Sequence, residues 1–406
     1  MKYASHGIAG CKGTIKSLLE DFVVDEIPAY PFSGSGTHVL VQVEKTGIST
    51  FEALRRICRE MGFSERDAGY AGLKDARGIT RQWFSLEHVD ADKLMALQIP
   101  KLRMLAVTRH GNKLKRGHLA GNRFEITLRD IDPQHVPLAA ATLEVLRKRG
   151  VPNWYDSQRF GQRGDNDALG LCLVRQDWPG FFDLLLGKPE LESHLPTQQA
   201  RKAFADGNLE EAIKLWPHNQ NLERGALKAL QEYGPTERAL KRLPQKNKQF
   251  YLSALQSRLF NQCLERRFDT FDQVRTGDLA QKENGACFLV EDAALEQPRA
   301  ASLEISATGP VFGFKMQQPA GKVLEFEQQV LADCGLTPES FDMGGGLGQK
   351  GDRRAYRFPL RDVQTTHDAE QRTLKLSFSL PKGCYATIVL KEITKLDQSV
   401  LPTEGD

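Results

Sequence analysis

Apolar and polar positions alternate most clearly in two parts of the chain that lie far apart in the sequence. Residues 373–380 (TLKLSFSL) alternate throughout, and residues 38–44 (HVLVQVE) form a run rich in Val and Leu, so both predict strands. Shorter strand-like runs occupy 102–108 and 122–128. A further strand is expected at 385–390, after the turn at 381–383.

Helical spacing dominates the middle of the chain. A first, isolated helix is expected from Ser49, which forms a capping box with Glu52, to about Met61, and a second over 136–149. From about residue 165 to 267 the segments are longer and rich in Gln, Leu, Ala and Arg, and strand alternation is nearly absent. Residues 277–350 return to mixed, Gly-rich sequence.

This order predicts an α+β fold with a discontinuous catalytic domain and an inserted, mostly helical α/β domain. At 406 residues, two domains are the default. We expect the strands near the C-terminus to complete a mixed, largely antiparallel sheet begun in the N-terminal half. The predicted boundaries are 1–154 and 351–406 for the two catalytic segments and 155–350 for the insertion.

Composition excludes several classes of protein. The chain is 40% apolar and 26% charged, with no membrane-length apolar run and no apolar signal-peptide core in MKYASHGIAGCK. Seven scattered cysteines without a CxxC support neither a disulfide framework nor a zinc site, so a reducing cytoplasm is expected. Net charge is only +3, but residues 101–129 hold eight Lys or Arg and one acid, which suggests contact with a polyanion. A solvated loop is an equally weighted alternative on this pattern alone.

Residues 70–84 (YAGLKDARGITRQWF) read as strand, tight connection and strand, with a charged pair at the bend. The structural alternative is that Asp75 and Gly78 are the first and fourth residues of a type I turn. Two other patterns carry little weight. The GxGxxG at 346–351 lacks the flanking strand and helix of a dinucleotide site, and the nine histidines lack metal-ligand spacing. A loop and no metal are expected.

AGLKDARGITRQW resembles the signature of the tRNA pseudouridine synthase D (TruD) family, roughly GxKDxxAxTxQ. Further blocks agree in order, although Gly78 stands where the family often has Ala. They are KSLLEDFVV at 16–24, GNRF at 121–124, PN at 152–153 with QRFG at 158–161, SRLFN at 257–261 and LPKGCYATIVLKE at 380–392.

The resemblance implies isomerisation of a tRNA uridine, most often at position 13, to pseudouridine, without metal or cofactor. One carboxylate must attack C1′ as a nucleophile or remove the C2′ proton as a base, and both routes stay open. We assign it to Asp75. Neighbours on a strand point to opposite faces, which argues against Lys74 as its partner. The resemblance implies that Lys16 is the partner, with Glu20 orienting Lys16.

Four further side chains are predicted to bind the substrate. Asn122 can hydrogen-bond Asp75 or the ribose, with a turn amide as the alternative. Phe22, Phe124 and Tyr385 suit stacking on a flipped uracil. Ordinary core packing is the stronger alternative for any single Phe on an apolar strand face.

The expected partner is tRNA, bound by a protein that we expect to be a monomer outside any membrane. The basic side chains expected to contact RNA are Arg109, Lys113, Lys115, Arg116, Arg123 and Arg159, with Arg163, Arg353 and Arg354 as second choices. Gln158, Arg159 and Phe160 can alternatively form a hinge where the domains join. Two other functions stay open: a non-catalytic tRNA-binding protein or RNA chaperone on the same scaffold, and a nucleotide enzyme resting on the glycines at 344–351.

Overall fold

The computed structural model describes residues 1–396, which form two compact units. The sheet unit comprises Tyr3–Pro152 together with residues 358–396, and the helical unit comprises Met1–Lys2 and Asn153–Arg357. The sheet unit is therefore built from two separate stretches of the chain. The domain boundaries expected at 154 and 350 stay a prediction.

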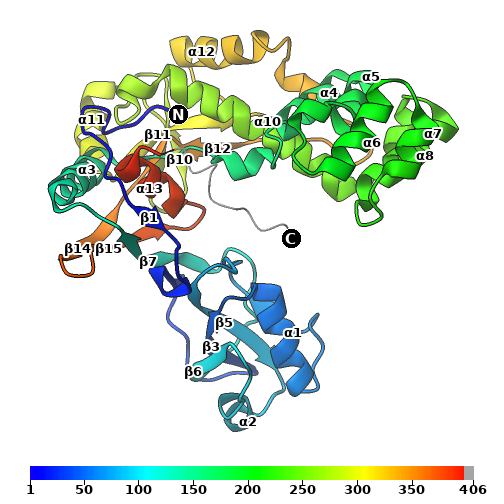
Figure 1. Ribbon diagram of the computed structural model, residues 1–406. Helices are drawn as coiled ribbons and strands as arrows, with labels where there is room; N and C mark the ends of the chain where they lie inside the picture. The colour runs from blue at the N-terminus through cyan, green and yellow to red at the C-terminus, as the bar shows by residue number, and fades with distance from the viewer. Residues whose placement is uncertain (397–406) are drawn as a thin grey trace. The chain divides into compact units, whose positions relative to one another are not determined.

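One mixed sheet organises the sheet unit (Figure 1). Its main path runs β14-β15-β7-β2-β5-β3-β6, while β1 pairs with β7 and β4 with β5. Only the β2–β5 pair is parallel. The strands are β1 (Thr14–Ile15), β2 (Phe22–Pro28), β3 (His38–Thr46), β4 (Gly69–Tyr70), β5 (Ile79–Glu87), β6 (Leu102–His110), β7 (Leu119–Arg129), β14 (Arg361–Asp368) and β15 (Thr373–Pro381).

The C-terminal strands complete the sheet that the N-terminal half begins. β15 pairs with β7 along its whole length, from Leu374 opposite Leu128 to Pro381 opposite Gly121. The predicted strands at 38–44, 102–108, 122–128 and 373–380 are confirmed, although β7 begins earlier than expected. The predicted α+β class with a mixed, largely antiparallel sheet is confirmed as well.

Helix α1 (Thr50–Glu60) packs against the strands through an apolar face (Figure 1). Ser49 caps it by accepting a hydrogen bond from Glu52 N, as the sequence predicts, but the Glu52 side chain pairs with Arg56. The core beneath it contains Val39, Val41, Val43, Ala53, Leu54, Ile57, Phe84 and Leu86. The unit also holds α2 (Ala91–Met95), α3 (Val136–Arg149), α13 (Ala386–Thr394), η1 (Leu19–Asp21) and η2 (Pro133–His135).

The strand predicted at 385–390 is wrong, because residues 386–394 form helix α13. The segment ATIVLKEIT is rich in β-branched residues, but it is buried on nearly every side, and such a run has no period that separates strand from helix. Glu392 is fully buried and accepts hydrogen bonds from Ala4 N at 2.7 Å and Ser5 N at 3.2 Å. Tertiary packing therefore outweighs strand propensity here.

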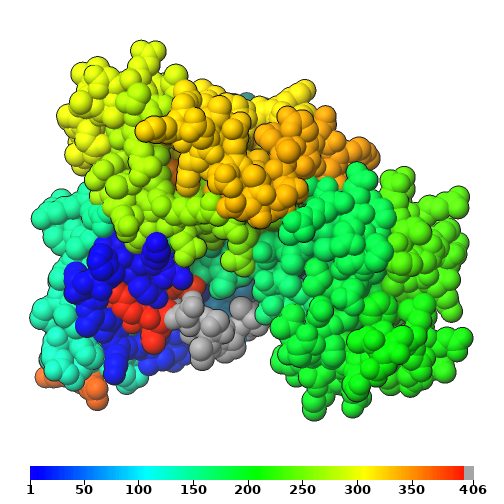
Figure 2. Space-filling view, turned by 90° about the horizontal axis from the view of Figure 1, so that it is seen from above, coloured from blue at the N-terminus to red at the C-terminus, as the bar shows by residue number. Residues whose placement is uncertain are grey.

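The helical unit begins after residue 152, where the sequence predicts a change from strand-rich to mostly helical segments. Helix α10 crosses its centre and contacts α4, α12 and β11, and Figure 2 shows residues of about 300–350, in yellow to orange, gathered beside it. A small sheet has the order β10-β9-β11-β12. The helices are α4 (Asn166–Arg175), α5 (Trp178–Leu186), α6 (Leu195–Ala205), α7 (Leu209–Leu215), α8 (Asn221–Tyr233), α9 (Glu237–Arg242), α10 (Gln245–Arg266), α11 (Ala293–Ala301) and α12 (Gly321–Ala332).

The remaining elements are short. The strands are β8 (Val151–Pro152), β9 (Leu279–Lys282), β10 (Cys287–Leu289), β11 (Ile305–Val311), β12 (Asp352–Ala355) and β13 (Arg357–Phe358). The 3₁₀ helices are η3 (Ser157–Phe160), η4 (Pro189–Leu191), η5 (Phe268–Thr270) and η6 (Pro338–Phe341). Residues 342–351 are irregular, so the glycines of the GxGxxG pattern lie in a loop, as predicted.

Candidate active site

The loop at 71–78, called the Asp75 loop below, connects β4 to β5. It is longer than the tight connection predicted. Within residues 1–396 the structure shows no backbone hydrogen bond between Asp75 and Gly78, but type I turns can form without that bond, so the turn stays an alternative interpretation. Neighbouring segments hold its backbone through several hydrogen bonds: Gly117 N to Ala71 O at 2.8 Å, Gln82 Nε2 to Gly72 O at 3.3 Å, Lys74 N to Thr50 Oγ1 at 2.9 Å and Gly47 N to Gly78 O at 3.1 Å.

Gly78 ends this loop in a conformation that side chains rarely adopt. Its φ is +146°, and a Cβ built there would lie 2.4 Å from the carbonyl oxygen of Phe22. The loop therefore approaches β2 more closely than alanine would allow. This contact explains why glycine suits the position where the family often has Ala.

Lys16 lies beside Asp75, although they are far apart in the sequence. Lys16 Nζ is 3.5 Å from Asp75 Oδ2 and 4.1 Å from the centre of the Phe22 ring. The Asp75 side chain is 62% exposed, whereas that of Lys16 is 18% exposed. Lys16 also has a left-handed backbone, with φ of +57°, a strained state for a residue with a side chain. The site thus offers an accessible carboxylate next to a constrained ammonium.

Lys74, which precedes Asp75, has a different partner. Its Nζ lies 2.7 Å from Glu26 Oε2, and both side chains are almost fully buried. The other carboxylate oxygen of Glu26 accepts from Trp83 N at 3.3 Å. Lys74 therefore anchors the Asp75 loop to β2.

Glu20 lies in η1 and is exposed. Within residues 1–396, the structure shows no hydrogen bond or ion pair between Glu20 and Lys16. Its neighbour Asp21 is buried instead and pairs with Arg129 at 2.7 Å. The expected role of Glu20 in orienting Lys16 stays a prediction.

Asn122 lies inside β7 rather than at its start, opposite Glu26 of β2 and Leu380 of β15. The structure shows no hydrogen bond between Asn122 and Asp75 within the described residues. Asn122 Oδ1 is buried and has no hydrogen-bond partner in the structure. Because buried polar atoms are usually paired, this oxygen is an acceptor available to a ligand.

The three predicted stacking residues differ in exposure. Phe22 and Phe124 are 3% and 6% exposed and contact each other edge to face at 6.2 Å, so both rings pack in the core. Tyr385 is 38% exposed and precedes α13. The turn before it is tied to the start of β7, because Lys382 N donates to Ala120 O at 3.0 Å.

The basic loop between β6 and β7 and the adjoining ends of these strands carry several of the predicted RNA contacts. Arg109, Lys115 and Arg123 are exposed. Arg116 donates to Tyr70 Oη at 2.8 Å and Lys113 to Arg66 O at 2.8 Å, which restrains both side chains. A hollow beside the loop is lined by Tyr30, His38, Gly111, Asn112, Lys113, Lys115 and His118.

The predicted RNA contacts of the helical unit are engaged in internal interactions. Arg159 donates to Ser257 Oγ at 3.2 Å and to Ser253 on α10. The structure argues against Arg353, a second choice from the sequence, as an RNA contact. Arg353 is 6% exposed and pairs with buried Glu327 at 2.7 Å. Two other second choices are also held by protein groups, Arg163 by Asp165 and Arg354 by Asn153.

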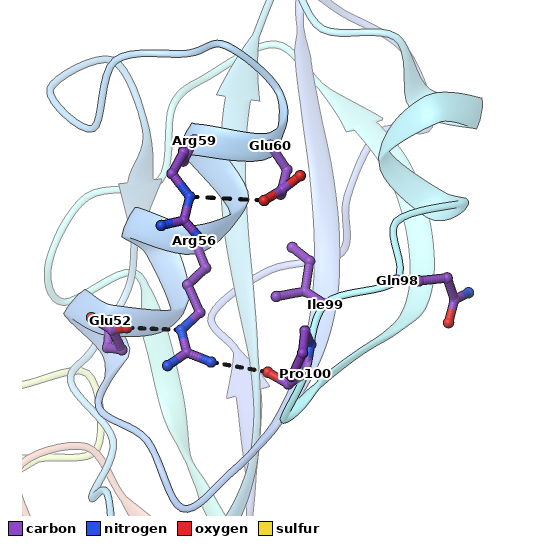
Figure 3. Close-up of a pocket in the computed structure, with 7 residues that line it drawn as sticks. All are labelled: Glu52, Arg56, Arg59, Glu60, Gln98, Ile99 and Pro100. Atoms are coloured by element: carbon purple, nitrogen blue, oxygen red, sulfur yellow. Dashed lines mark hydrogen bonds and ion pairs between the residues drawn. The ribbon is translucent and has the colours of Figure 1, made fainter.

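Another pocket lies between α1 and residues 98–100 and contains none of the predicted site residues. Its lining is Glu52, Arg56, Arg59, Glu60, Gln98, Ile99 and Pro100. Figure 3 shows that Arg56 reaches across it from Glu52, at 2.7 Å, to Pro100 O, at 3.1 Å. Its charged groups are occupied with one another, so we assign it no function.

The sequence alone did not identify the residues whose side chains hydrogen-bond to the backbone of the Asp75 loop. Thr50 Oγ1 accepts from Lys74 N and donates to Gln82 Oε1 at 2.9 Å, and Lys45 donates to the carbonyl of Asp75 at 2.7 Å. Thr50 follows the capping Ser49, and Lys45 is the next-to-last residue of β3, which are ordinary positions for these residue types. No local pattern signals their contacts, which depend on tertiary structure.

Residues 1–396 also lack two features that would indicate another class of protein. No helix there is long and apolar enough to cross a membrane. No group of three or more His, Cys, Asp or Glu side chains within the same residues is arranged to hold a metal ion.

Comparison with known proteins gives consistent matches over the whole length. A family model described as tRNA pseudouridine synthase D (TruD) matches residues 1–393. A Geobacter metallireducens protein named tRNA pseudouridine synthase D is 45% identical over 396 residues, covering 97% of this chain and 98% of that protein. An Anaeromyxobacter dehalogenans protein of the same name is 34% identical over 407 residues, covering 100% and 99%. A crystal structure of a Methanosarcina mazei protein assigned to tRNA pseudouridine synthase D matches with a TM-score of 0.85 at 25% identity, covering 98% and 97%.

Proposed function

Because this chain belongs to the tRNA pseudouridine synthase D family, we propose that it is an isomerase that converts a tRNA uridine into pseudouridine. The target implied by the family resemblance is position 13. The N1–C1′ bond breaks, the uracil turns, and a C5–C1′ bond forms while C5 loses a proton and N1 gains one. Substrate and product have the same composition, so the balance requires no oxidant, reductant or energy-rich cofactor.

The observation that carries the proposal is the Asp75 carboxylate, exposed on a loop whose backbone is held from several sides. An exposed carboxylate can reach the sugar as a nucleophile at C1′ or as a base at C2′. Lys16 at 3.5 Å places a positive charge beside it. This charge stabilises the carboxylate before the reaction and can balance charge that develops on the departing uracil.

We propose that four side chains predicted from the sequence bind the uridine. Asn122 Oδ1, buried and without a partner in the structure, can accept a hydrogen bond from the base or ribose. Tyr385 offers an exposed ring for stacking, which contributes about 1–3 kcal/mol per base. Phe22 and Phe124 are buried, so they would contribute apolar packing beneath the base rather than an exposed ring for stacking. Together these contacts offset part of the few kcal/mol needed to unstack a base.

The proposed partner is tRNA, bound by a cytoplasmic monomer. The side chains proposed to contact phosphates from the sheet unit are Arg109, Lys113, Lys115, Arg116 and Arg123. Arg159 would do so from the helical unit, which we propose as the inserted RNA-binding domain. The hollow beside Lys113 fits a phosphate. It contains His38, which is 8% exposed and whose Nδ1 has no partner in the structure.

The test is to map pseudouridine on an unmodified tRNA transcript by carbodiimide treatment and primer extension. The proposal predicts one new stop, at position 13, after incubation with the wild-type protein. A stop at another uridine would keep the reaction and correct the position. Tight tRNA binding without any stop would instead favour the non-catalytic RNA-binding protein.

Salt dependence tests the basic loop separately from catalysis. Lys113→Ala and Lys115→Ala should each weaken tRNA binding and lower the slope of log K against log salt by about 0.7–0.9, because each removes one phosphate contact. The measurement is filter binding over a series of salt concentrations. Lys93→Ala, which removes an exposed lysine of α2, is the matched control. Slopes equal to wild type in both loop variants would contradict the assignment.

A further inference from the structure

Lys45 is a fully buried lysine close to the candidate active site. It lies near the end of β3, opposite Thr80 of β5 and Leu102 of β6, and is 0% exposed. Within residues 1–396 the structure shows no carboxylate in ion-pair contact with it. A buried ammonium without an ion pair is costly, so its presence calls for a physical explanation.

Three backbone carbonyls surround the ammonium. Lys45 Nζ donates to Ile48 O at 2.7 Å, Asp75 O at 2.7 Å and Lys74 O at 3.3 Å. An ammonium has three N–H donors, so all of them have acceptors. Hydrogen bonds from a charged donor are shorter and stronger than neutral ones. Two of the carbonyls belong to the Lys-Asp pair that carries the proposed chemistry.

These bonds tie the Asp75 loop to the corner between β3 and α1. Thr50 and Gly47 of the same corner hold Lys74 N and Gly78 O. Residues 71–78 form no regular secondary structure, so such bonds set the position of the Asp75 backbone. A misplacement of about 1 Å at a reacting group can cost about 100-fold in rate.

The charged groups near Lys45 also help to explain why an ammonium is buried there. The charged groups that face it are Asp75, which favours its protonated form, and Lys74, which opposes it. Lys74 is already balanced by Glu26, and the opposed Thr80 and Leu102 carry no charge. Asp75 is thus the carboxylate that faces both Lys16 and Lys45.

We propose that Lys45 is a positioning residue for pseudouridine formation, which holds the Asp75 loop through its bonds to the carbonyls of Lys74 and Asp75. The inference rests on the proposed function. Lys45 is fully buried, so we do not expect it to touch the substrate. It acts through the backbone that presents the Asp75 carboxylate.

The proposal predicts a fall in rate at alkaline pH. Burial lowers the pKa of Lys45 to about 8, with Asp75 raising it and Lys74 lowering it further. Above that pH the side chain loses one donor and its charge, so the loop loosens and turnover falls. Because the ordinary pKa is 10.5, the folded form releases this proton before the unfolded form does. This group alone therefore makes stability rise between pH 8 and 10.5 while the rate falls.

The experiment compares Lys45→Met and Lys45→Arg with wild type on the tRNA transcript. Lys45→Met should lower the single-turnover rate about 100-fold, with tRNA Kd within threefold of wild type. Lys45→Arg, which keeps a charged donor, should retain more activity and should lose the fall in rate above pH 8. Lys248→Met is the matched control, because Lys248 is also buried and donates to a backbone carbonyl, Leu240 O at 3.3 Å, but lies in the helical unit.

Hydrogen exchange of the peptide covering 71–78 provides a readout that does not depend on activity. Lys45→Met should raise its exchange rate at least tenfold, while Lys248→Met leaves it unchanged. Unchanged exchange together with a wild-type rate in Lys45→Met would overturn the proposal. If the wild type forms no pseudouridine but exchange still rises in Lys45→Met, the proposed function fails while the holding of the loop by Lys45 stands.

Discussion

Replacing Asp75 with asparagine should lower the single-turnover rate of pseudouridine formation by about 10⁴-fold or more, because an amide can serve neither as the nucleophile at C1′ nor as the base at C2′. The side chain is 62% exposed, so its loss leaves no cavity. The main-chain carbonyl of residue 75 remains to accept from Lys45. We therefore expect unchanged folding and tRNA Kd within threefold of wild type.

The measurement is pseudouridine formed against time at saturating enzyme, with Kd from filter binding. Asp67→Asn is the matched control, because it changes an exposed aspartate on the approach to β4 outside the proposed site. It should keep the wild-type rate. A rate for Asp75→Asn within tenfold of wild type would remove this carboxylate from the mechanism.

The largest effect on stability is expected from Lys74→Met. Within residues 1–396, this change leaves Glu26, 6% exposed, with the long hydrogen bond from Trp83 N as its one remaining side-chain contact. Breaking a buried ion pair by removing one partner costs about 3–5 kcal/mol, because the remaining charge is buried without compensation. The sheet unit should lose about that much free energy of unfolding, and the loop that carries Asp75 should loosen with it.

The measurement is hydrogen exchange of peptides from β2 and β5 over a series of urea concentrations, which reports the sheet unit apart from the helical unit. The double variant Glu26→Gln with Lys74→Met should recover much of the loss, because no charge then remains buried. Lys115→Met, on an exposed lysine, should change the free energy of unfolding by less than about 0.5 kcal/mol. A loss below about 1 kcal/mol for Lys74→Met would show that the pair contributes little.

Local patterns predicted most of the elements but failed where packing decides. The capping Ser49, the strand at 38–44 and the alternation at 373–380 each produced the expected element. The run at 386–394 became a helix, because apolar residues on nearly every side are compatible with either structure once buried. The connection at 71–78 is longer than the tight connection predicted, and side chains from other segments hydrogen-bond to its backbone, which no local pattern indicates.

The sequence by itself determined the α+β class, the family resemblance and the identity of the candidate carboxylate, because strand alternation, helical spacing and the ordered motifs are local properties of the chain. Only the tertiary structure decided the partners of that carboxylate. In the folded chain Lys16 pairs with Asp75 and Lys74 is buried against Glu26, while Lys45 donates a hydrogen bond to the carbonyl of Asp75. These contacts join residues about 30 to 60 positions apart, and such long-range contacts arise only when β2, β3 and β5 lie side by side in one sheet.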